Sequence, residues 1–185
     1  IVVEAADGNT IEYGYDNNNR ITSITGGENE TKNFTYNGDN KVTSVTNGES
    51  IVEFELSYTD NTVTKKDALD NSWTYTIENE RVVEEIDPLD QKTSYEYDED
   101  KNLTKVTTPR GTIFYGYDEE NRKVSETSYK GIITTYQYHD IWSSITHMNT
   151  GDSHTEIQYN EDGKISKRIE ADGTATSFGY NQKGQ

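Results

Sequence analysis

The sequence predicts an all-β protein built from tandem β-hairpin repeats that form an elongated antiparallel β-sheet strip with essentially no helix. Three observations predict this class. A tyrosine-containing phrase recurs about every 20 residues along the chain. Around it, β-prone residues alternate with polar ones on either side of turns rich in Asn and Gly, which is typical of β-hairpins. No segment keeps a 3.6-residue apolar period bounded by helix caps.

The composition favours ordered β-structure with a thin core. The chain has 185 residues, of which 17 are Lys or Arg and 34 are Asp or Glu, giving a net charge of −17. Only 30% of the residues are hydrophobic, which leaves little material for a thick core. Such a composition is typical of disordered chains, but the 14 tyrosines suit pleated, half-buried surfaces. We therefore expect a folded sheet that keeps much of its surface in water.

Several functional classes are excluded by the same composition. No stretch approaches the 18 apolar residues of a membrane-spanning helix, and the strong negative charge opposes binding to nucleic-acid phosphates. The absence of Cys excludes disulfides, thiolate metal sites and a cysteine nucleophile. The chain opens at Ile1 with no signal-type apolar segment, so we expect a processed product or a fragment.

The repeat is visible in the spacing of one aromatic position. Successive members are separated by 21, 22, 19, 20, 20, 21, 21 and 21 residues, and one of them is Ile instead of Tyr. The spacing predicts that residues 1–185 form a single array of about nine hairpin repeats of 19–22 residues, truncated at both ends. The structural anchors of these repeats are Tyr15, Tyr36, Tyr58, Ile77, Tyr97, Tyr117, Tyr138, Tyr159 and Tyr180.

Each repeat consists of two predicted strands around a polar turn. An alternating run such as residues 112–117 leads into the turn, and a basic residue followed by an aliphatic one, such as Arg20 and Ile21, begins the second strand. The Asp or Asn after the tyrosine is suited to start the turn, because its side chain can bond to the backbone two residues on. The turns are predicted to need a positive φ, which Asn and Gly tolerate, at Asn19, Asn40, Asn121, Gly163 and Gly184.

The aliphatic residues of the second strand show an unusual spacing. Ile21 and Ile24 are three residues apart, as are Val42 and Val45, and Leu103 and Val106. One face of a regular strand requires an even spacing. Either the second strand contains a β-bulge or apolar groups lie on both faces of the sheet.

The repeated phrase resembles the YD repeat of the Rhs/YD-repeat family. Residues 13–21 read Tyr-Gly-Tyr-Asp-Asn-Asn-Asn-Arg-Ile, and residues 95–103 and 115–122 follow the same pattern. Residues 87–90, Asp-Pro-Leu-Asp, resemble the Asp-Pro-Leu-Gly spacer between such repeats. The resemblance extends from about residue 7 to residue 185. The Asp after the aromatic is replaced at Thr59, Glu78 and His139, so the family pattern does not predict the turns at these positions.

Membership of this family would have several implications. The family includes bacterial wall-associated and Rhs polymorphic toxins, insecticidal toxin-complex subunits and animal teneurins. Its repeats form a curved β-sheet strip that spirals into a hollow shell, and in bacterial members the shell encloses a C-terminal toxin domain. The mid-array position of Asp87-Pro88 matches only a spacer, so no autoproteolytic residue is expected in this chain.

The residues that could act in catalysis or bind a metal show no pattern typical of an active site. The three histidines, His139, His147 and His154, show no compact ligand spacing and are expected at exposed hairpin positions. The sequence therefore predicts no catalytic residue, no cofactor and no metal ligand. Trp73 and Trp142 depart from the tyrosine pattern and are the candidate residues for contact with a partner.

Two functional hypotheses follow. The first is a structural segment of a YD-repeat shell that scaffolds or encapsulates a toxin or partner domain of the same parent chain. That parent would be secreted or at the cell surface, wall-associated and bacterial. The alternative is a cell-surface module that binds cell-wall glycan or a receptor. We expect no enzyme activity, no nucleic-acid partner and no membrane span, and unpaired edge strands would permit edge-to-edge self-association.

Overall fold

The computed structural model describes residues 1–4, 10–26 and 30–181. The chain divides into two compact units, residues 1–92 and 93–185. The described residues contain eighteen β-strands and no helix, so the predicted all-β class is confirmed. No described segment forms a helix long and apolar enough to cross a membrane.

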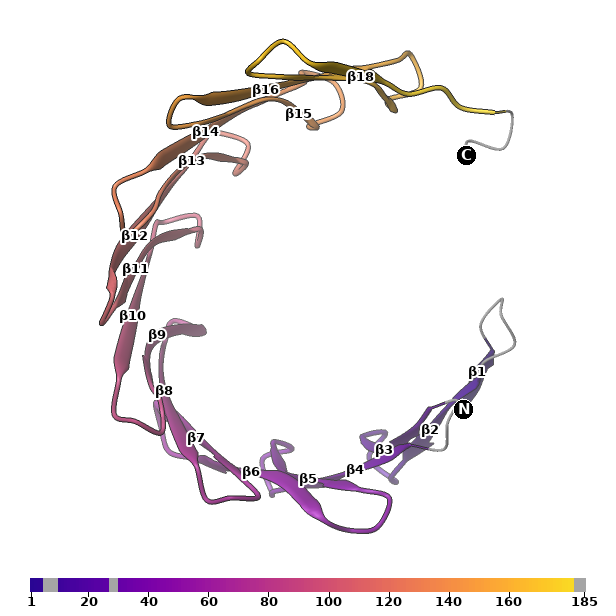
Figure 1. Ribbon diagram of the computed structural model, residues 1–185. Helices are drawn as coiled ribbons and strands as arrows, with labels where there is room; N and C mark the ends of the chain where they lie inside the picture. The colour runs from indigo at the N-terminus through magenta and orange to yellow at the C-terminus, as the bar shows by residue number, and fades with distance from the viewer. Residues whose placement is uncertain (5–9, 27–29, 182–185) are drawn as a thin grey trace. The chain divides into compact units, whose positions relative to one another are not determined.

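In the first unit, successive strands pair antiparallel in chain order. Figure 1 shows these strands side by side. The strands are β1 (Val2–Glu4), β2 (Thr10–Tyr15), β3 (Ile21–Thr25), β4 (Thr31–Tyr36), β5 (Val42–Asn47), β6 (Val52–Tyr58), β7 (Thr62–Asp67), β8 (Ser72–Glu78) and β9 (Arg81–Ile86).

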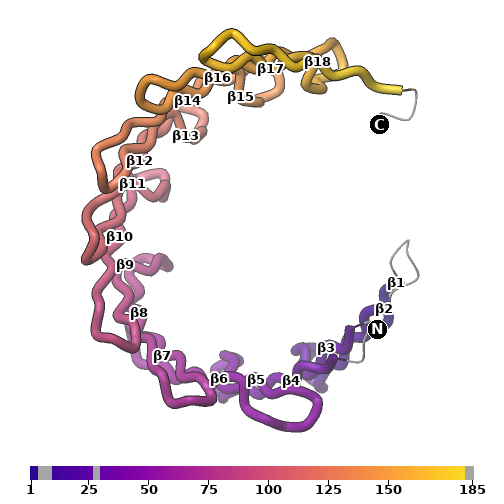
Figure 2. The backbone as a smooth tube through the Cα atoms, in the orientation of Figure 1, coloured from indigo at the N-terminus to yellow at the C-terminus, as the bar shows by residue number. Residues whose placement is uncertain are grey.

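The second unit repeats this arrangement, beginning with a strand whose first residue closes the first unit. The backbone tube in Figure 2 passes back and forth through its hairpins. The strands are β10 (Lys92–Tyr97), β11 (Leu103–Thr108), β12 (Gly111–Tyr117), β13 (Lys123–Thr127), β14 (Ile133–Tyr138), β15 (Ile145–Thr150), β16 (Ser153–Tyr159), β17 (Ile165–Glu170) and β18 (Ala175–Ser177).

The sheet of each unit has one face that carries the ladder aromatics and one face that is mainly polar, with Phe114 as an exception on the polar face. Residues directly opposite each other in paired strands share a face, and Val45 lies opposite both Phe34 and Phe54. On the other face, Ser44 lies opposite Thr35 and Glu55. Around Val45, the apolar side chains therefore lie on the aromatic face.

The predicted thin core is present. Val45, with 3% of its surface exposed, is the only buried apolar side chain among the described residues. A single-layered sheet cannot enclose a large apolar volume, because no second layer packs against it. Stability must therefore come from interactions between neighbouring strands and within turns.

The turns have the predicted backbone conformation. Asn19, Asn40, Asn121 and Gly163 all have positive φ, between 61° and 73°; the prediction for Gly184 falls outside the described residues. In each of these turns the backbone N–H of this residue donates to the carbonyl oxygen three residues earlier, as in Asn19 to Asp16, at 3.1 Å. Lys101 occupies the same position with φ of 69°, although lysine, unlike Asn or Gly, is not favoured in this backbone conformation.

Lys101→Gly should therefore stabilise the protein by about 0.5–1 kcal/mol, because glycine removes the cost of a left-handed backbone at this exposed turn. Glu99→Gly is the matched control: it lies in the same turn at a residue without positive φ, so it should destabilise. Chemical unfolding followed by circular dichroism measures both changes. An equal loss of stability in the two variants would show that position 101 carries no such cost.

Candidate functional site

The candidate site is the joint between successive hairpin repeats, and it begins with a β-bulge. In the hairpin of β2 and β3, Gly14 lies opposite Ser23 but Tyr15 lies opposite Ile21, so Thr22 is an extra residue. This bulge brings Ile21 and Ile24 to the same face despite their spacing of three. Of the two explanations that the sequence left open, the bulge is correct.

In the described residues, eight hairpins pair a strand that carries an anchor residue with the strand that follows it, and the same register shift occurs in seven of these repeat hairpins. In each, the anchor residue at the end of the first strand lies opposite the first or second residue of the following strand, and one residue of that strand is unpaired. The extra residues are Thr22, Thr43, Val83, Thr104, Val124, Thr146 and Ser166. The exception is the hairpin of β6 and β7, whose register is regular.

The anchor tyrosine of the next repeat bonds to the backbone at this bulge. Its hydroxyl donates to the carbonyl oxygen of the residue that lies opposite the preceding anchor. These bonds are Tyr36 to Ile21 (2.5 Å), Tyr58 to Val42 (2.6 Å), Tyr117 to Leu103 (2.9 Å), Tyr138 to Lys123 (2.6 Å), Tyr159 to Ile145 (2.7 Å) and Tyr180 to Ile165 (2.8 Å). The anchor position is therefore a joint between repeats as well as a member of an aromatic ladder.

The isoleucine among the anchors agrees with this arrangement. Ile77 follows the hairpin of β6 and β7, which is the hairpin without a bulge. Its backbone N–H donates to the carbonyl oxygen of Asn61 at 2.8 Å. After the hairpin that has no bulge, the anchor residue thus also lacks the hydroxyl that bonds to a bulge in six of the other repeats.

The Asp and Arg of the repeat phrase hold the turn. One carboxylate oxygen of Asp16, Oδ1, accepts the backbone N–H groups of Asn18 (2.8 Å) and Arg20 (3.0 Å), and the other accepts the Arg20 Nε–H at 2.6 Å. The backbone N–H of Arg20 is the largest cause that lowers the pKa of Asp16 below its ordinary value, and the Arg20 guanidinium contributes in the same direction. Asp118 and Arg122 make the same contacts in a later repeat.

The basic residue of the phrase also contacts the next repeat. The guanidinium carbon of Arg20 lies 4.6 Å from the ring centre of Tyr36, and that of Arg122 lies 4.9 Å from Tyr138. Such cation–π contacts contribute about 0.5–1 kcal/mol at exposed sites. Lysine takes this role in two other repeats, Lys41 over Tyr58 at 5.0 Å and Lys164 over Tyr180 at 5.1 Å.

The turns at Thr59, Glu78 and His139 differ from the turn at Asp16. At Thr59 the hydroxyl accepts the backbone N–H of Thr62 in a shorter turn. At Glu78 the chain reverses through Asn79 and Glu80, both with positive φ. His139 accepts the N–H of Ile141 on its Nδ1 atom at 3.1 Å.

The two tryptophans lie against side chains of their own unit. Lys65 Nζ is 5.1 Å from the ring centre of Trp73. Trp142 stacks on His139, with ring centres 4.3 Å apart, and meets Tyr159 edge-on. A Cβ atom at Gly163 would come within 3.3 Å of the Trp142 ring, so the glycine allows this ring to lie against the next turn. Contact of either tryptophan with a partner stays a prediction.

One group of side chains was missed by sequence reasoning. His147, His154 and Glu156 are half-buried, and one potential metal-ligand atom from each, a ring nitrogen or a carboxylate oxygen, lies within 4.8 Å of the others. The hairpin of β15 and β16 brings them together through the two-residue turn Gly151-Asp152, which places His147 opposite Glu156. Reading that turn as a two-residue hairpin loop would have given this register from the sequence.

The bulge, the tyrosine joint and the Asp–Arg turn together define a β-hairpin repeat protein. The family model described as RHS Repeat matches residues 79–113. The resemblance to Rhs/YD repeats is therefore confirmed at this segment. No curated protein sequence matches the chain.

Solved structures show a similar fold. The TcdB2-TccC3-Cdc42 crystal structure matches with a TM-score of 0.60 and 11% identity, over 100% of this chain and 13% of that chain. A Photorhabdus luminescens Tc holotoxin pore containing a TccC3 variant matches with a TM-score of 0.55 and 13% identity, over 98% and 13%. TcdB2-TccC3 without its hypervariable C-terminal region gives 0.51 and 11%, over 92% and 12%. The chain thus spans a small part of these proteins, and the likeness is one of fold.

The Asp16 turn predicts a specific pH dependence of stability. Asp16→Asn should keep the backbone bonds, as Asn37 does at the same position of the next repeat with 2.9 and 3.0 Å contacts, but it removes the charge that pairs with Arg20. Because the folded-state pKa is lowered, the advantage of wild type is fully present above the ordinary value near 3.8. It is lost as the pH falls through the lowered pKa.

Chemical unfolding of both proteins between about pH 6 and pH 2 measures this difference. Asp39→Asn, at an exposed position of the next turn, controls for the removal of one negative charge from an acidic protein. A wild-type advantage over Asp16→Asn that stays constant across this range, or that equals the Asp39→Asn effect, would contradict the role of the carboxylate.

Proposed function

We propose that the chain is a structural segment of a larger Rhs/YD-repeat shell, which scaffolds or encloses a toxin or other partner domain of the same parent protein. The parent is secreted or exposed at a bacterial cell surface. The observation that carries the proposal is the tyrosine joint, which has the same geometry at Tyr36, Tyr58, Tyr117, Tyr138, Tyr159 and Tyr180.

A joint of this kind is suited to building a wall. A repeat with both features contributes a tyrosine hydroxyl to the repeat before it and a bulge carbonyl to the repeat after it, as Tyr138 and Ile145 do in one repeat. Repeats joined only to their neighbours can be added in any number, as in other repeat proteins. The family match and the fold shared with TcdB2-TccC3 support this interpretation.

The side chains of the joint support a structural role over an enzymatic one. Its tyrosine hydroxyls donate to backbone carbonyls, its carboxylates accept backbone N–H groups, and its cations lie over rings. These groups already have partners in the folded protein. Their hydrogen bonds and cation–π contacts stabilise the sheet and leave none of them directed toward a substrate.

The proposal is tested by limited proteolysis of the full-length parent protein. With wild-type repeats, the enclosed partner domain should resist protease. The double variant Tyr138→Ala/Tyr159→Ala removes two adjacent joints and should increase the cleavage rate of that domain by about tenfold or more, since each lost joint costs on the order of 1 kcal/mol or more. Tyr129→Ala, at a half-exposed turn position, is the matched control and should leave the rate unchanged.

Equal cleavage of the partner domain in all three proteins would contradict an enclosing role. Glycan binding by the 185-residue chain that is lost in Trp73→Ala or Trp142→Ala would support the alternative, a surface binding module.

A further inference from the structure

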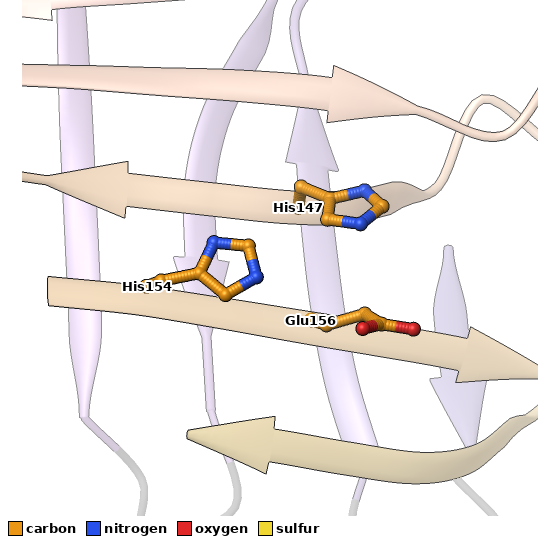
Figure 3. Close-up of side chains that lie close together, drawn as sticks. All are labelled: His147, His154 and Glu156. Carbon is orange, nitrogen blue, oxygen red and sulfur yellow. The ribbon is translucent and has the colours of Figure 1, made fainter. Parts of the chain in front are cut away.

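The His147, His154 and Glu156 group lies on the polar face of the second unit, opposite the aromatic ladder. His147 on β15 is directly opposite Glu156 on β16, and Asn149 is directly opposite His154. All four residues share one face, because opposite residues of paired strands do so and His154 and Glu156 are two residues apart. Figure 3 shows the two imidazoles and the carboxylate projecting from the same side of adjacent strands.

The hydrogen bonds of His147 determine which of its nitrogens is free. The Thr146 hydroxyl donates its single proton to the carbonyl oxygen of Gln137 at 3.2 Å. The same hydroxyl oxygen lies 3.2 Å from His147 Nδ1, so it accepts there and Nδ1 carries the proton. The lone pair of His147 is therefore on Nε2, the nitrogen without this contact.

His154 is held in the same tautomer by an amide. Its Nδ1 lies 2.5 Å from the Asn149 Oδ1 atom, which can only accept, so Nδ1–H donates. The Asn149 amide is oriented in turn by its nitrogen, which donates to the Thr135 hydroxyl on β14 at 3.3 Å. A partner that fixes the tautomer and the ring orientation is the usual outer contact of a metal-binding histidine.

The carboxylate has a corresponding partner. Gln158 Nε2 donates to Glu156 Oε1 at 2.8 Å, and Gln158 lies on the same face of β16 two residues further on. This contact leaves the second carboxylate oxygen available. In each of the three side chains, one nitrogen or oxygen atom is thus held by a hydrogen bond, and the other is available to coordinate a metal ion.

We propose that His147, His154 and Glu156 bind a divalent transition-metal ion of the Zn²⁺ class. Two imidazole nitrogens and one carboxylate oxygen form a ligand set that Zn²⁺ accepts, and imidazole disfavours Ca²⁺ and Mg²⁺, which take oxygen ligands. Tetrahedral coordination at Zn–N and Zn–O distances near 2.1 Å places ligand atoms about 3.4 Å apart. The ligand atoms, which now lie within 4.8 Å of one another, would need to approach by at most about 1.4 Å, which is within reach of side-chain rotation.

The bound ion would link two strands that a short turn already holds in register. Because β15 and β16 are joined by the two-residue turn Gly151-Asp152, the ligands converge within a single hairpin and need no movement between distant parts of the chain. The half-buried position leaves the remaining coordination positions to water. An ion that binds the folded protein but not the unfolded chain would raise the melting temperature by mass action.

Zinc chloride titrated into the chelator-treated 185-residue chain tests the proposal by calorimetry. We expect one ion per chain, retained in excess Mg²⁺ and Ca²⁺, and a higher melting temperature. In wild-type protein, the imidazole nitrogen NMR signals of His147 and His154 should shift on addition of zinc, while those of His139, which stacks on Trp142, should not. This measurement does not depend on the folding of any variant.

Variants give the second readout. His147→Gln, His154→Gln and Glu156→Gln should each weaken zinc binding by at least about tenfold, and His139→Gln is the matched control that should bind as wild type does. Absence of binding, displacement by Mg²⁺ or Ca²⁺, one ion for two chains, or equal affinity in the three ligand variants and the control would each overturn the proposal.

Discussion

The hydrogen bond from an anchor tyrosine to the bulge of the preceding repeat, formed by six of the anchors, is the interaction on which the rest of the structure depends. A bulge takes one residue out of the ladder, and the carbonyl at its edge then needs another donor. The next tyrosine supplies that donor, as Tyr138 does for Lys123 and Tyr159 for Ile145. The carbonyl oxygen left at the bulge and the hydroxyl of the tyrosine in the aromatic ladder thus satisfy each other's hydrogen bonding. Of the hairpins whose first strand carries an anchor in the described residues, only β6–β7 has a regular register, and the anchor that follows it is Ile77, which has no hydroxyl.

This constraint explains how a chain with few apolar residues holds an ordered sheet. With Val45 as the only buried apolar side chain of the described residues, burial of a large core is not available. The repeat instead combines several local contributions. A tyrosine hydrogen bond contributes about 1 kcal/mol, a cation over its ring about 0.5–1 kcal/mol, and the Asp carboxylate satisfies two backbone N–H groups of its own turn. All of these act within a repeat or between neighbours, which leaves the polar face free for other uses.

The sequence was sufficient for whatever depends on one repeat alone. The period located the anchors, and the residue types located the turns, including positive φ at Asn19, Asn40, Asn121 and Gly163. The sequence was insufficient where the strand register determines which side chains share a face or lie opposite each other. The spacing of three between Ile21 and Ile24 fits a bulge or two apolar faces equally well, and only the pairing with Tyr13 and Tyr15 distinguishes them. His147 and Glu156 are nine residues apart and become neighbours only through the Gly151-Asp152 turn, so spacing alone concealed them.

The most direct test of this account is the unfolding free energy of Tyr138→Phe, which removes the hydroxyl and keeps the ring. The account predicts a loss of about 1 kcal/mol, because the Lys123 carbonyl loses its donor while the contact with Arg122 persists. Tyr129→Phe, at a turn position with 51% of the residue exposed, should change little. Equal stabilities of Tyr138→Phe, Tyr129→Phe and wild type would show that the ladder ring alone joins the repeats, and would contradict the central role of the hydroxyl.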